Sequence, residues 1–376
     1  MNFSIGEWVK RGLYITSLVF FLFSLPSETF AQTKKLRIFI VDSYHPQYLW
    51  SKDTTKGLCA ALKDFKFLDN DQQIDELTTK DLLETDIIVI KKVWMDSKHK
   101  SRKDEIKAIT KNIVNEINKF KPDLVFLGDD NATNFIGAHL FNTKIPVVFW
   151  GVDFNPFAYG YIDSLAHPGH NVTGVYQAEY IKDTMRYLIR LKPSVKKFAI
   201  LSDASETGLA KTRAVLKLSE DGQLPLQLID QVATNSFSEW QDRILELRSK
   251  VDAFYVVNHG TLRDDNGAYV DTFMAGAWYL SNVKIPEISP EKQFVQEGML
   301  LSVDDSGYKQ AYEAGRMADM VLHHHIAPGN IPVVAPSRGA IMVNRQRASM
   351  LGIDLSHQDF IEQYIERSDA LAQYPP

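Results

Sequence analysis

Cysteine is almost missing from this sequence, which has Cys59 alone among its 376 residues. A single thiol cannot close an internal disulfide, so a disulfide framework is excluded. Cys59 lies in an apolar helical pattern, and we therefore expect a small buried hydrophobic residue and not a reactive group.

The sequence also lacks the short motifs of common enzyme chemistries. It has no G-x-S-x-G nucleophile elbow, no Walker A loop, no G-x-G-x-x-G dinucleotide fingerprint and no H-E-x-x-H zinc motif. We expect no catalytic residues and no cofactor, so the chain is predicted not to be an enzyme.

The spacing of the histidines in the sequence does not indicate a metal site. His323, His324 and His325 are consecutive, and consecutive helical residues point about 100° apart, so they cannot converge on one ion. His167 and His170 flank a glycine, but the sequence offers no third ligand beside them. We therefore predict no bound metal.

An excess of positive charge is absent as well. Lysines and arginines number 42 against 47 aspartates and glutamates, which gives a net charge of −5. This balance argues against nucleic acid or an anionic membrane as the main partner. Hydrophobic residues make up 45% of the chain, as in folded proteins, and its length predicts two lobes in place of one core.

The N-terminus has the pattern of an export signal. Lys10 and Arg11 precede an apolar run at 13–25, and polar and small residues follow up to Ala31. This order predicts a secretory signal peptide over residues 1–31, cleaved near Ala31, and a periplasmic location. The apolar run is shorter than the roughly 20 residues of a membrane span, with an uncleaved anchor as the alternative.

Segments typical of strands and helices alternate along the remaining chain. Strands are expected at 36–41, 87–90, 123–127, 146–150, 198–201 and 253–257. Helices are expected to open at Ser51, at Ser101 with Asp104, at Ile181, at Ser236 with Glu239 and at Ser306. This alternation predicts an α/β fold with parallel sheets covered by helices on both faces.

Residues 145–175 indicate where one sheet gives way to another. A buried strand ends at Gly151, an irregular segment with prolines and glycines follows, and a strand-like NVTGV run begins at Asn171. We interpret this as a chain that leaves a first sheet and starts a second one. The alternative is an ordinary surface loop.

Motifs in several parts of the chain share one resemblance. They are SYHP at 43–46 with Trp50, IPVVF at 145–149, Asp153-x-x-Pro156, SLAHPGHNVTGV at 164–175, EGMLLS at 297–302, and IPVVAPSRGAIMVN…ASMLGIDL at 331–355. In this order they resemble the ABC-transporter substrate-binding family of periplasmic proteins, over nearly all of the chain that follows the predicted signal peptide.

The resemblance implies the type I periplasmic-binding-protein fold, in which two Rossmann-like lobes with parallel sheets flanked by helices are joined by a three-segment hinge. The expected N-terminal lobe comprises 32–152 and 302–327, and the expected C-terminal lobe comprises 153–301 and 328–355. The helix that opens at Ser306 is expected to return to the first lobe before a third crossing near 328–332. Residues 356–376 are expected to form a helical tail.

Candidate ligand-binding residues follow from the position of the strands. In open α/β sheets, ligands bind beyond the carboxyl ends of the strands, so polar residues that come just after a strand are the candidates. They are Ser43, Tyr44, Asp129, Asp130, Asn131, Asp153, Tyr176, Gln177, Asp203, Asn258 and Asp304.

Asp129 and Asp130 are the most specific of these candidates. One of them could hold a ligand ammonium, while Asn131 opens a helix whose N–H groups could meet a carboxylate. The alternative is that both aspartates only cap that helix. Tyr44 with Trp50 could form an aromatic wall, or Trp50 could instead pack ahead of the helix as a hydrophobic staple.

Together these features predict an exported solute-binding protein. We expect a monomer that captures a small ligand, amino-acid-like or cationic, between two lobes and delivers it to the permease of an ABC transporter. The alternative is a periplasmic ligand-sensing module that signals to a membrane kinase or cyclase.

Overall fold

The computed structural model describes residues 34–153, 160–178 and 180–375. Two compact units divide the chain, residues 1–35 and 36–376, and the second contains nearly all of the described residues. The predicted signal peptide and the Pro156 part of the crossover lie outside the described residues. In the part of the chain that the structure describes, no helix has both the length and the apolar character needed to cross a membrane.

The described strands form two mostly parallel sheets, as predicted. The first sheet has the order β2-β3-β1-β4-β5-β6, with β1 (Leu36–Asp42), β2 (Leu82–Glu84), β3 (Ile88–Trp94), β4 (Leu124–Gly128), β5 (Val147–Val152) and β6 (Val172–Tyr176). The second has the order β13-β12-β11-β10-β9-β7-β8, with β7 (Lys197–Ser202), β8 (Gln227–Ala233), β9 (Ala253–Val256), β10 (Glu287–Ser289), β11 (Leu301–Val303), β12 (Ile341–Asn344) and β13 (Gln363–Ile365). The antiparallel neighbours are β2 with β3 and β11 with β12.

Helices flank both sheets. The longer ones are α2 (Leu49–Asp64), α3 (Asp71–Thr79), α4 (Lys103–Phe120), α6 (Ile181–Leu191), α7 (Glu206–Glu220), α8 (Phe237–Leu247), α9 (Thr272–Asn282) and α11 (Gly307–Leu322). The short ones are α5 (Asp129–Asn131), α10 (Lys292–Glu297), α12 (Arg345–Met350), α13 (Asp369–Gln373), the π-helix η1 (Ala132–Ile136) and the 3-10 helices η2 (Gly137–His139) and η4 (Pro328–Asn330).

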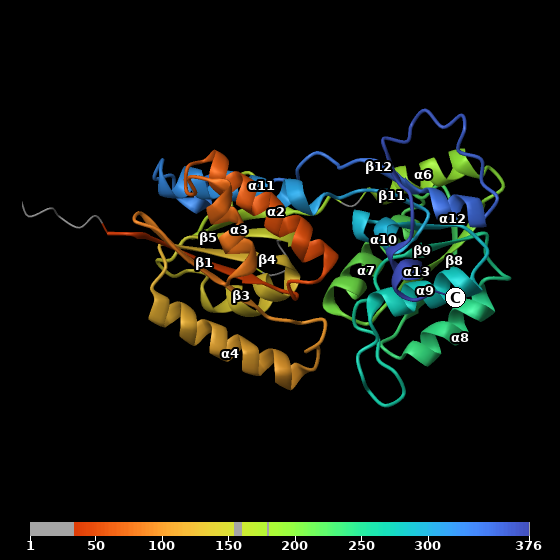
Figure 1. Ribbon diagram of the computed structural model, residues 1–376, viewed down its shortest axis with the longest axis horizontal. Coiled ribbons are helices and arrows are strands. Elements are labelled where there is room, and N and C mark those ends of the chain that lie inside the picture. Colours follow the sequence, from red (N-terminus) through yellow and green to blue (C-terminus); the bar gives the residue numbers. More distant parts are fainter. Residues whose placement is uncertain (1–33, 154–159, 179, 376) are drawn as a thin grey trace, which may run out of the picture. The chain divides into compact units, whose positions relative to one another are not determined.

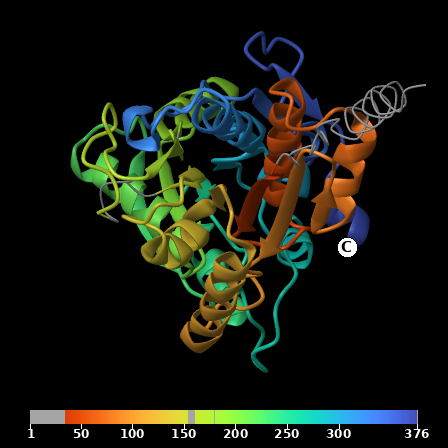
Figure 2. The same cartoon turned by 90° about the vertical axis from the view of Figure 1, so that its left-hand side faces the viewer.

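Helices bury both faces of the first sheet. Successive residues of each strand point to opposite faces and therefore join two different cores. Ile38 and Ile40 of β1 join the core formed with α2 and α11, whereas Phe39 and Val41 join the core formed with α4. Figure 1 shows α2 and α11 on one side of the sheet and α4 on the other. Figure 2 shows α2 and α11 side by side in the view turned by 90°. We call this sheet with its helices the first lobe.

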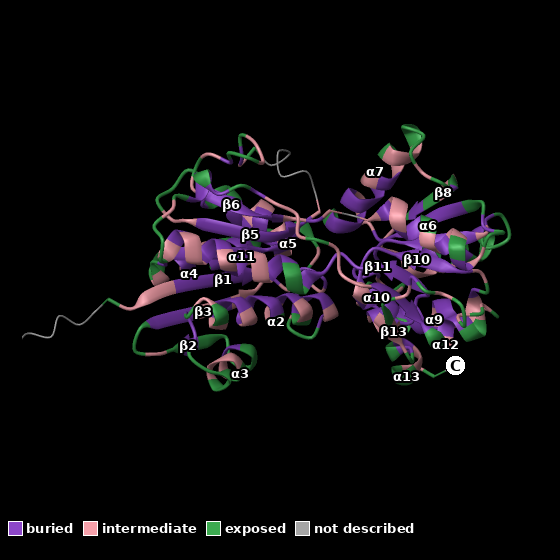
Figure 3. Ribbon diagram, turned by 90° about the horizontal axis from the view of Figure 1, so that it is seen from above, coloured by how far each residue is buried: buried purple, intermediate pink, exposed green. Residues whose placement is uncertain are grey.

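The second sheet is covered in the same way. Phe198 and Ile200 of β7 join the core formed with α6 and α7. Ala199 and Leu201 join the core formed with α8 and α9, in which Trp240 is fully buried. Figure 3 shows most strands of both sheets as buried and the exposed residues on loops and outer helix surfaces. We call this sheet with its helices the second lobe.

Three of the predicted helix starts are confirmed and two differ: α6 begins at Ile181 as expected, whereas α2 begins at Leu49 and not at Ser51. The side chains of Ser236 and Ser306 accept the N–H of the third following residue, at 3.2 Å and 3.4 Å, and so cap α8 and α11. At the start of α4, the Glu105 carboxylate accepts the N–H of Arg102 at 3.1 Å. The predicted Ser-Asp pair is therefore not the cap of α4.

The first crossing between the lobes comes later than we predicted. We interpreted NVTGV at 171–175 as the start of the second sheet, and this is wrong. β6 runs parallel to β5 in the first sheet, with Val172 opposite Val147. The crossing therefore lies between β6 and α6. A buried strand reads as an apolar run whichever strand it pairs with, so the sequence could not reveal this.

The other two crossings complete the predicted connection. After β11 the chain passes to α11, which packs against α2 and the first sheet as expected. The third crossing comes slightly later than the expected 328–332, because Val334 still bridges Val175 of β6, and it leads to β12. The tail predicted to be helical at 356–376 also contains a strand, because β13 pairs with β12. The residue boundaries of the two lobes otherwise remain a prediction.

Candidate ligand-binding site

A small cavity of about 10 Å³ lies where strand ends of the two lobes meet. Four predicted ligand-binding residues line it: Tyr44, Asp153, Gln177 and Asn258. The other lining residues are Tyr48, Trp50, Lys98, Thr207, Lys211, Val257, Glu291, Gln293 and Phe294. We call this space the ligand cavity. A volume of this size holds about one water molecule and no amino acid or sugar.

Hydrogen bonds join the two lobes across the ligand cavity. The hydroxyl groups of Tyr44 and Thr207 lie 3.1 Å apart, and Gln293 Nε2 donates to Tyr48 Oη at 3.2 Å. Each pair combines a residue of the loop after β1 with a residue of the second lobe. A ligand larger than water can therefore enter only when these contacts separate.

Aromatic side chains form one wall of the ligand cavity, as the sequence suggested for Tyr44 and Trp50. Tyr44, Tyr48 and Trp50 form a buried cluster, with the Tyr44 and Tyr48 rings 5.2 Å apart and nearly perpendicular. Trp50 lies in the first turn of α2, and its Nε1 donates to Asp129 Oδ1 at 2.7 Å. The wall thus has an apolar body that is fixed by a buried hydrogen bond.

Two glycines allow the strand ends behind this wall to approach closely. A Cβ atom at Gly128, the last residue of β4, would lie 2.6 Å from the Trp150 ring. Gly151 has a φ of +71°, and a Cβ there would lie 2.2 Å from Asp129 Oδ1. Asp129 itself has a φ of +67°, which is costly for a residue with a side chain and is typical of functional positions.

Asp129 and Asp130 are buried behind the aromatic wall and do not line the ligand cavity. Burial, reinforced by the nearby Asp42, raises the pKa of Asp129 well above its usual range. Asp130 Oδ2 accepts the N–H of Asp153 at 3.4 Å. Gly128 is the N-cap of α5, and the carboxylate of Asp129 accepts from Trp50, so capping does not account for this side chain.

Lys98 brings an ammonium group into the ligand cavity from the loop after β3. Its Nζ lies 4.3 Å from the centre of the Tyr44 ring and 5.3 Å from that of Tyr48, and the residue is only 2% exposed. Burial lowers the pKa of Lys98, although Asp203 and Glu291 oppose this at longer range. Within the described chain, no hydrogen bond or ion pair reaches this ammonium. It is a buried cation held by aromatic faces alone.

Lys211 brings a second ammonium group from α7. Its Nζ lies 3.1 Å from Asp153 Oδ1, donates to Gln177 Oε1 at 3.1 Å and contacts Glu291 Oε1. All four side chains are almost fully buried. With Lys98, the cavity therefore combines two ammonium groups with two carboxylates, a set of charges that suits a ligand carrying both signs.

A larger cavity of about 680 Å³ lies on the other side of Lys98. Lys98 and Thr207 line both cavities, and Asn131, a predicted site residue, lines only the larger one. Asn131 Nδ2 donates to Ser97 Oγ at 2.8 Å. Lys98 is thus shared by the small ligand cavity and a neighbouring space of ligand size.

Several predicted residues shape the loops and do not line the ligand cavity. Ser43 Oγ donates to the Gly128 carbonyl at 2.6 Å and accepts the Ala132 N–H at 2.8 Å. Asp203 accepts the Thr261 N–H at 2.9 Å. Tyr176 is partly buried and packs against the core that the first sheet forms with α4. A role of these residues in binding remains a prediction.

Asp304 lies in a different place from the other candidates. It lines a cavity of about 780 Å³ beside the second crossing, together with charged residues such as Asp53, Lys292 and Arg338. Asp304 Oδ1 accepts the Lys292 N–H at 2.9 Å, but burial raises the pKa of Asp304 to about 7.

The sequence did not single out several cavity residues. Lys98 and Glu291 follow β3 and β10, so the strand-end rule applies to them. We expected the strand at 87–90 to end at Ile90, whereas β3 continues to Trp94, and we did not recognise β10. Lys211 lies inside α7 as one of its buried residues, and no sequence signal marks such a position. The loop after β1 extends the aromatic wall from Tyr44 to Tyr48.

The fold and the site define a two-lobed solute-binding protein, and the sequence comparisons agree. Residues 69–362 match the family of ABC transporter substrate binding proteins, so the chain belongs to this family. Its members are solute-binding proteins and not enzymes, and they work outside the cytoplasm. A tyrosine-binding protein of Clostridioides difficile (strain R20291) is 25% identical over 260 residues, which cover 69% of this chain and 71% of that protein.

Solved structures confirm the fold. The ABC domain of a Streptococcus pneumonia protein, in complex with L-Trp, covers 88% of this chain and 100% of its own, with a TM-score of 0.66 and 19% identity. A substrate binding protein with adhesive properties from Clostridium difficile, ligand-free and open, covers 88% and 99%, with a TM-score of 0.62 and 20% identity.

Proposed function

We propose that this chain is an exported, monomeric binding protein that delivers a zwitterionic, amino-acid-like ligand to an ABC permease. The observation that carries the proposal is the set of opposite charges against an aromatic wall in the ligand cavity. The tyrosine-binding relative and the related L-Trp complex support an amino acid with an aromatic side chain.

Each part of such a ligand has a partner in the ligand cavity. Its carboxylate would meet Lys98, the buried cation that has no ion-pair partner among the described residues. Its ammonium group would meet Asp153 and Glu291, which now surround Lys211. We expected Asp129 or Asp130 in this role, but both lie behind the aromatic wall, and Asp153 and Glu291 are the acids that face the cavity.

Binding requires the lobes to separate and close again. The 10 Å³ cavity cannot admit an amino acid while the Tyr44–Thr207 and Tyr48–Gln293 contacts persist. Ligand can then shift the balance between open and closed forms only through its difference in affinity for the two. Solution X-ray scattering should show a smaller radius of gyration for the saturated protein; equal radii would contradict closure.

A calorimetric panel tests the ligand class. L-Tyrosine and L-tryptophan are compared with tyramine, which lacks the carboxylate, and with 3-(4-hydroxyphenyl)propanoate, which lacks the ammonium group. Loss of a charge pair excluded from water costs about 2–5 kcal/mol, so each truncated compound should bind at least about 30-fold more weakly. Equal affinity of tyramine and tyrosine would exclude the carboxylate contact, and binding of neither amino acid would exclude the ligand class.

Delivery and export need tests of their own. A strain without this gene should take up the identified ligand more slowly, and expression of the chain should restore uptake. Unchanged uptake, with altered output of a membrane kinase or cyclase, would favour the sensing alternative. Sequencing the N-terminus of the periplasmic protein should find a start near residue 32; an intact N-terminus in the membrane fraction would contradict cleavage.

A further inference from the structure

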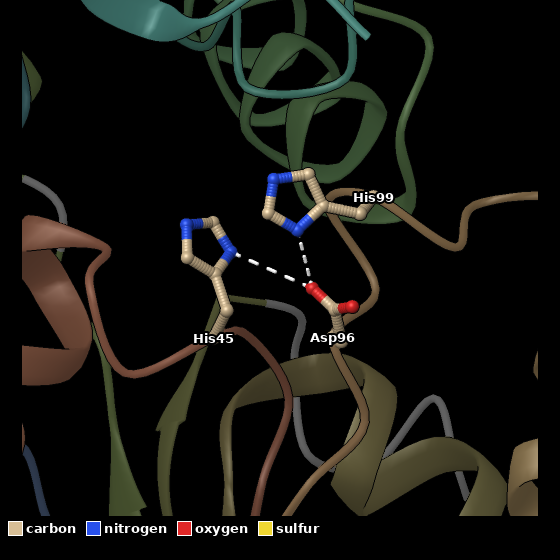
Figure 4. Close-up of side chains that lie close together, drawn as sticks. All are labelled: His45, Asp96 and His99. Carbon is tan, nitrogen blue, oxygen red and sulfur yellow. Dashed lines mark hydrogen bonds and ion pairs between the residues drawn. The ribbon is translucent and has the colours of Figure 1, made fainter.

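Two loops of the first lobe bring His45, Asp96 and His99 together. His45 follows β1, whereas Asp96 and His99 follow β3. His99 Nδ1 lies 2.5 Å and His45 Nδ1 3.7 Å from the same carboxylate oxygen, Asp96 Oδ1. Figure 4 shows both imidazole rings turned toward this oxygen. Of the described residues, this trio alone brings three potential metal-binding side-chain atoms within 4.8 Å of one another.

The trio has the donor set of a transition-metal site. Two imidazoles and one carboxylate are common ligands of Zn²⁺, and three protein ligands leave a fourth position open. With Zn–N and Zn–O bonds of about 2.0–2.1 Å, ligand atoms of a tetrahedral site lie about 3.3 Å apart. The His45–Asp96 distance of 3.7 Å is close to this spacing, and the His99–Asp96 distance needs widening by less than about 1 Å.

The surroundings leave the donor atoms available. His45 Nδ1 is buried and has no hydrogen-bond partner among the residues that the structure describes, although it faces the carboxylate. Lys100 Nζ lies 3.3 Å from Asp96 Oδ2, the oxygen that the histidines do not share. A buried polar ring nitrogen without a partner is costly, and a metal ion on Asp96 Oδ1 and both rings would satisfy it.

The trio also lies against the second lobe. The His99 ring packs edge-on against Tyr269 at 4.4 Å, and the His99 carbonyl accepts from Arg263 Nη2 at 2.6 Å. The His45 ring lies 5.6 Å from Tyr48, which lines the ligand cavity. A metal ion would therefore fix two first-lobe loops at the place where the second lobe touches them. Lys100 and Arg263 add positive charge nearby, so we expect an exchangeable site and not a structural one.

We propose that His45, Asp96 and His99 bind a divalent transition metal, with Zn²⁺ the best match, at the contact between the lobes. The bound ion orders the loops that carry Tyr48 and Lys98 and so favours the closed form. This site is independent of the identity of the organic ligand.

The test uses full-length mature protein without an affinity tag, freed of metal by chelation. Competition with a chromophoric zinc indicator should give one Zn²⁺ per chain. His45→Gln and His99→Gln should each lower the affinity at least tenfold, and Co²⁺ should give visible absorption bands of a four-coordinate site that the variants lose. The matched control is His323→Gln with His324→Gln, two histidines that both contact Asp319 on the surface.

Circular dichroism establishes that the variants fold, so that loss of binding reports on the site. The control variant should keep both the stoichiometry and the affinity. Absence of Zn²⁺ binding by the parent would overturn the proposal, as would full affinity in a His45→Gln/His99→Gln double variant. Because the readout is metal binding without organic ligand, its outcome does not depend on the proposed transport function.

Discussion

Replacing Lys98 by methionine should change stability and ligand binding in opposite directions. The Lys98 ammonium is buried against two tyrosine rings, and no side chain of the described residues forms an ion pair with it. An uncompensated buried charge lowers the stability of the fold by several kcal/mol, and contacts of the cation with aromatic faces offset up to about 2 kcal/mol of this. Methionine keeps the length and the apolar contacts of the stem. We therefore expect Lys98→Met to raise the free energy of unfolding by about 1–3 kcal/mol.

The same substitution should weaken ligand binding. If Lys98 meets the ligand carboxylate, its loss leaves that carboxylate buried and unpaired, at a cost of about 2–5 kcal/mol in binding free energy. Urea unfolding followed by tryptophan fluorescence gives the stability, and calorimetry with L-tyrosine or L-tryptophan gives the affinity. Lys111→Met, on the exposed face of α4, is the control and should change neither quantity by more than about 0.5 kcal/mol.

The opposite signs make this prediction easy to refute. A purely structural lysine would lower both stability and affinity when it is replaced. A spectator would leave both unchanged. Either outcome would remove Lys98 from the ligand-binding role and would leave Lys211 as the cation to examine.

Three further outcomes follow from buried groups elsewhere in the chain. Arg347→Met should lower the free energy of unfolding by about 3–5 kcal/mol, since Glu287 would lose a buried partner held by two 2.8 Å hydrogen bonds. A double variant that also replaces Glu287 by methionine should recover much of this stability in urea unfolding. Burial raises the pKa of Asp304 to about 7, so its contribution to stability is full below about pH 4 and is lost as the pH rises through 7. Asp304→Asn should flatten that part of the stability–pH curve, and an unchanged curve would exclude the raised pKa. Gly151→Ala should lower the free energy of unfolding by more than about 1 kcal/mol, because its Cβ would meet a carboxylate at 2.2 Å. Gly267→Ala, at a residue with a φ of +78° but with open space around it, should lower it by about 1 kcal/mol. Equal losses of stability on thermal unfolding would rule out the clash.

The sequence predicted the architecture well because buried parallel strands leave a direct trace. β1 and β4 read as apolar runs, and amphipathic helices such as α4 follow strands at regular intervals. Pairing is different, since it depends on tertiary contacts. The run that became β6 has the composition of a strand of either sheet, and only its hydrogen bonds assign it to the first.

The lining of the candidate site was predictable where a residue comes directly after a strand end. Tyr44, Asp153, Gln177 and Asn258 satisfy that rule and line the ligand cavity. Lys211 reaches the cavity from inside a helix, where the sequence shows only an ordinary amphipathic pattern. His45 and Asp96 are far apart in the chain, and no spacing motif connects them before the two loops fold together.

The connection of the lobes also fixes when the protein can fold. The core of the first lobe needs Ala311, Ala314 and Met317 of α11, which are synthesised after most of the second lobe. The second sheet in turn needs β12 and β13, which come later still. Each core can therefore be completed only late in synthesis, after much of the other lobe has been made. We therefore expect a chain built in this order to lack a complete second sheet until β13 is made, and an incompletely folded polypeptide can be threaded through a narrow export channel.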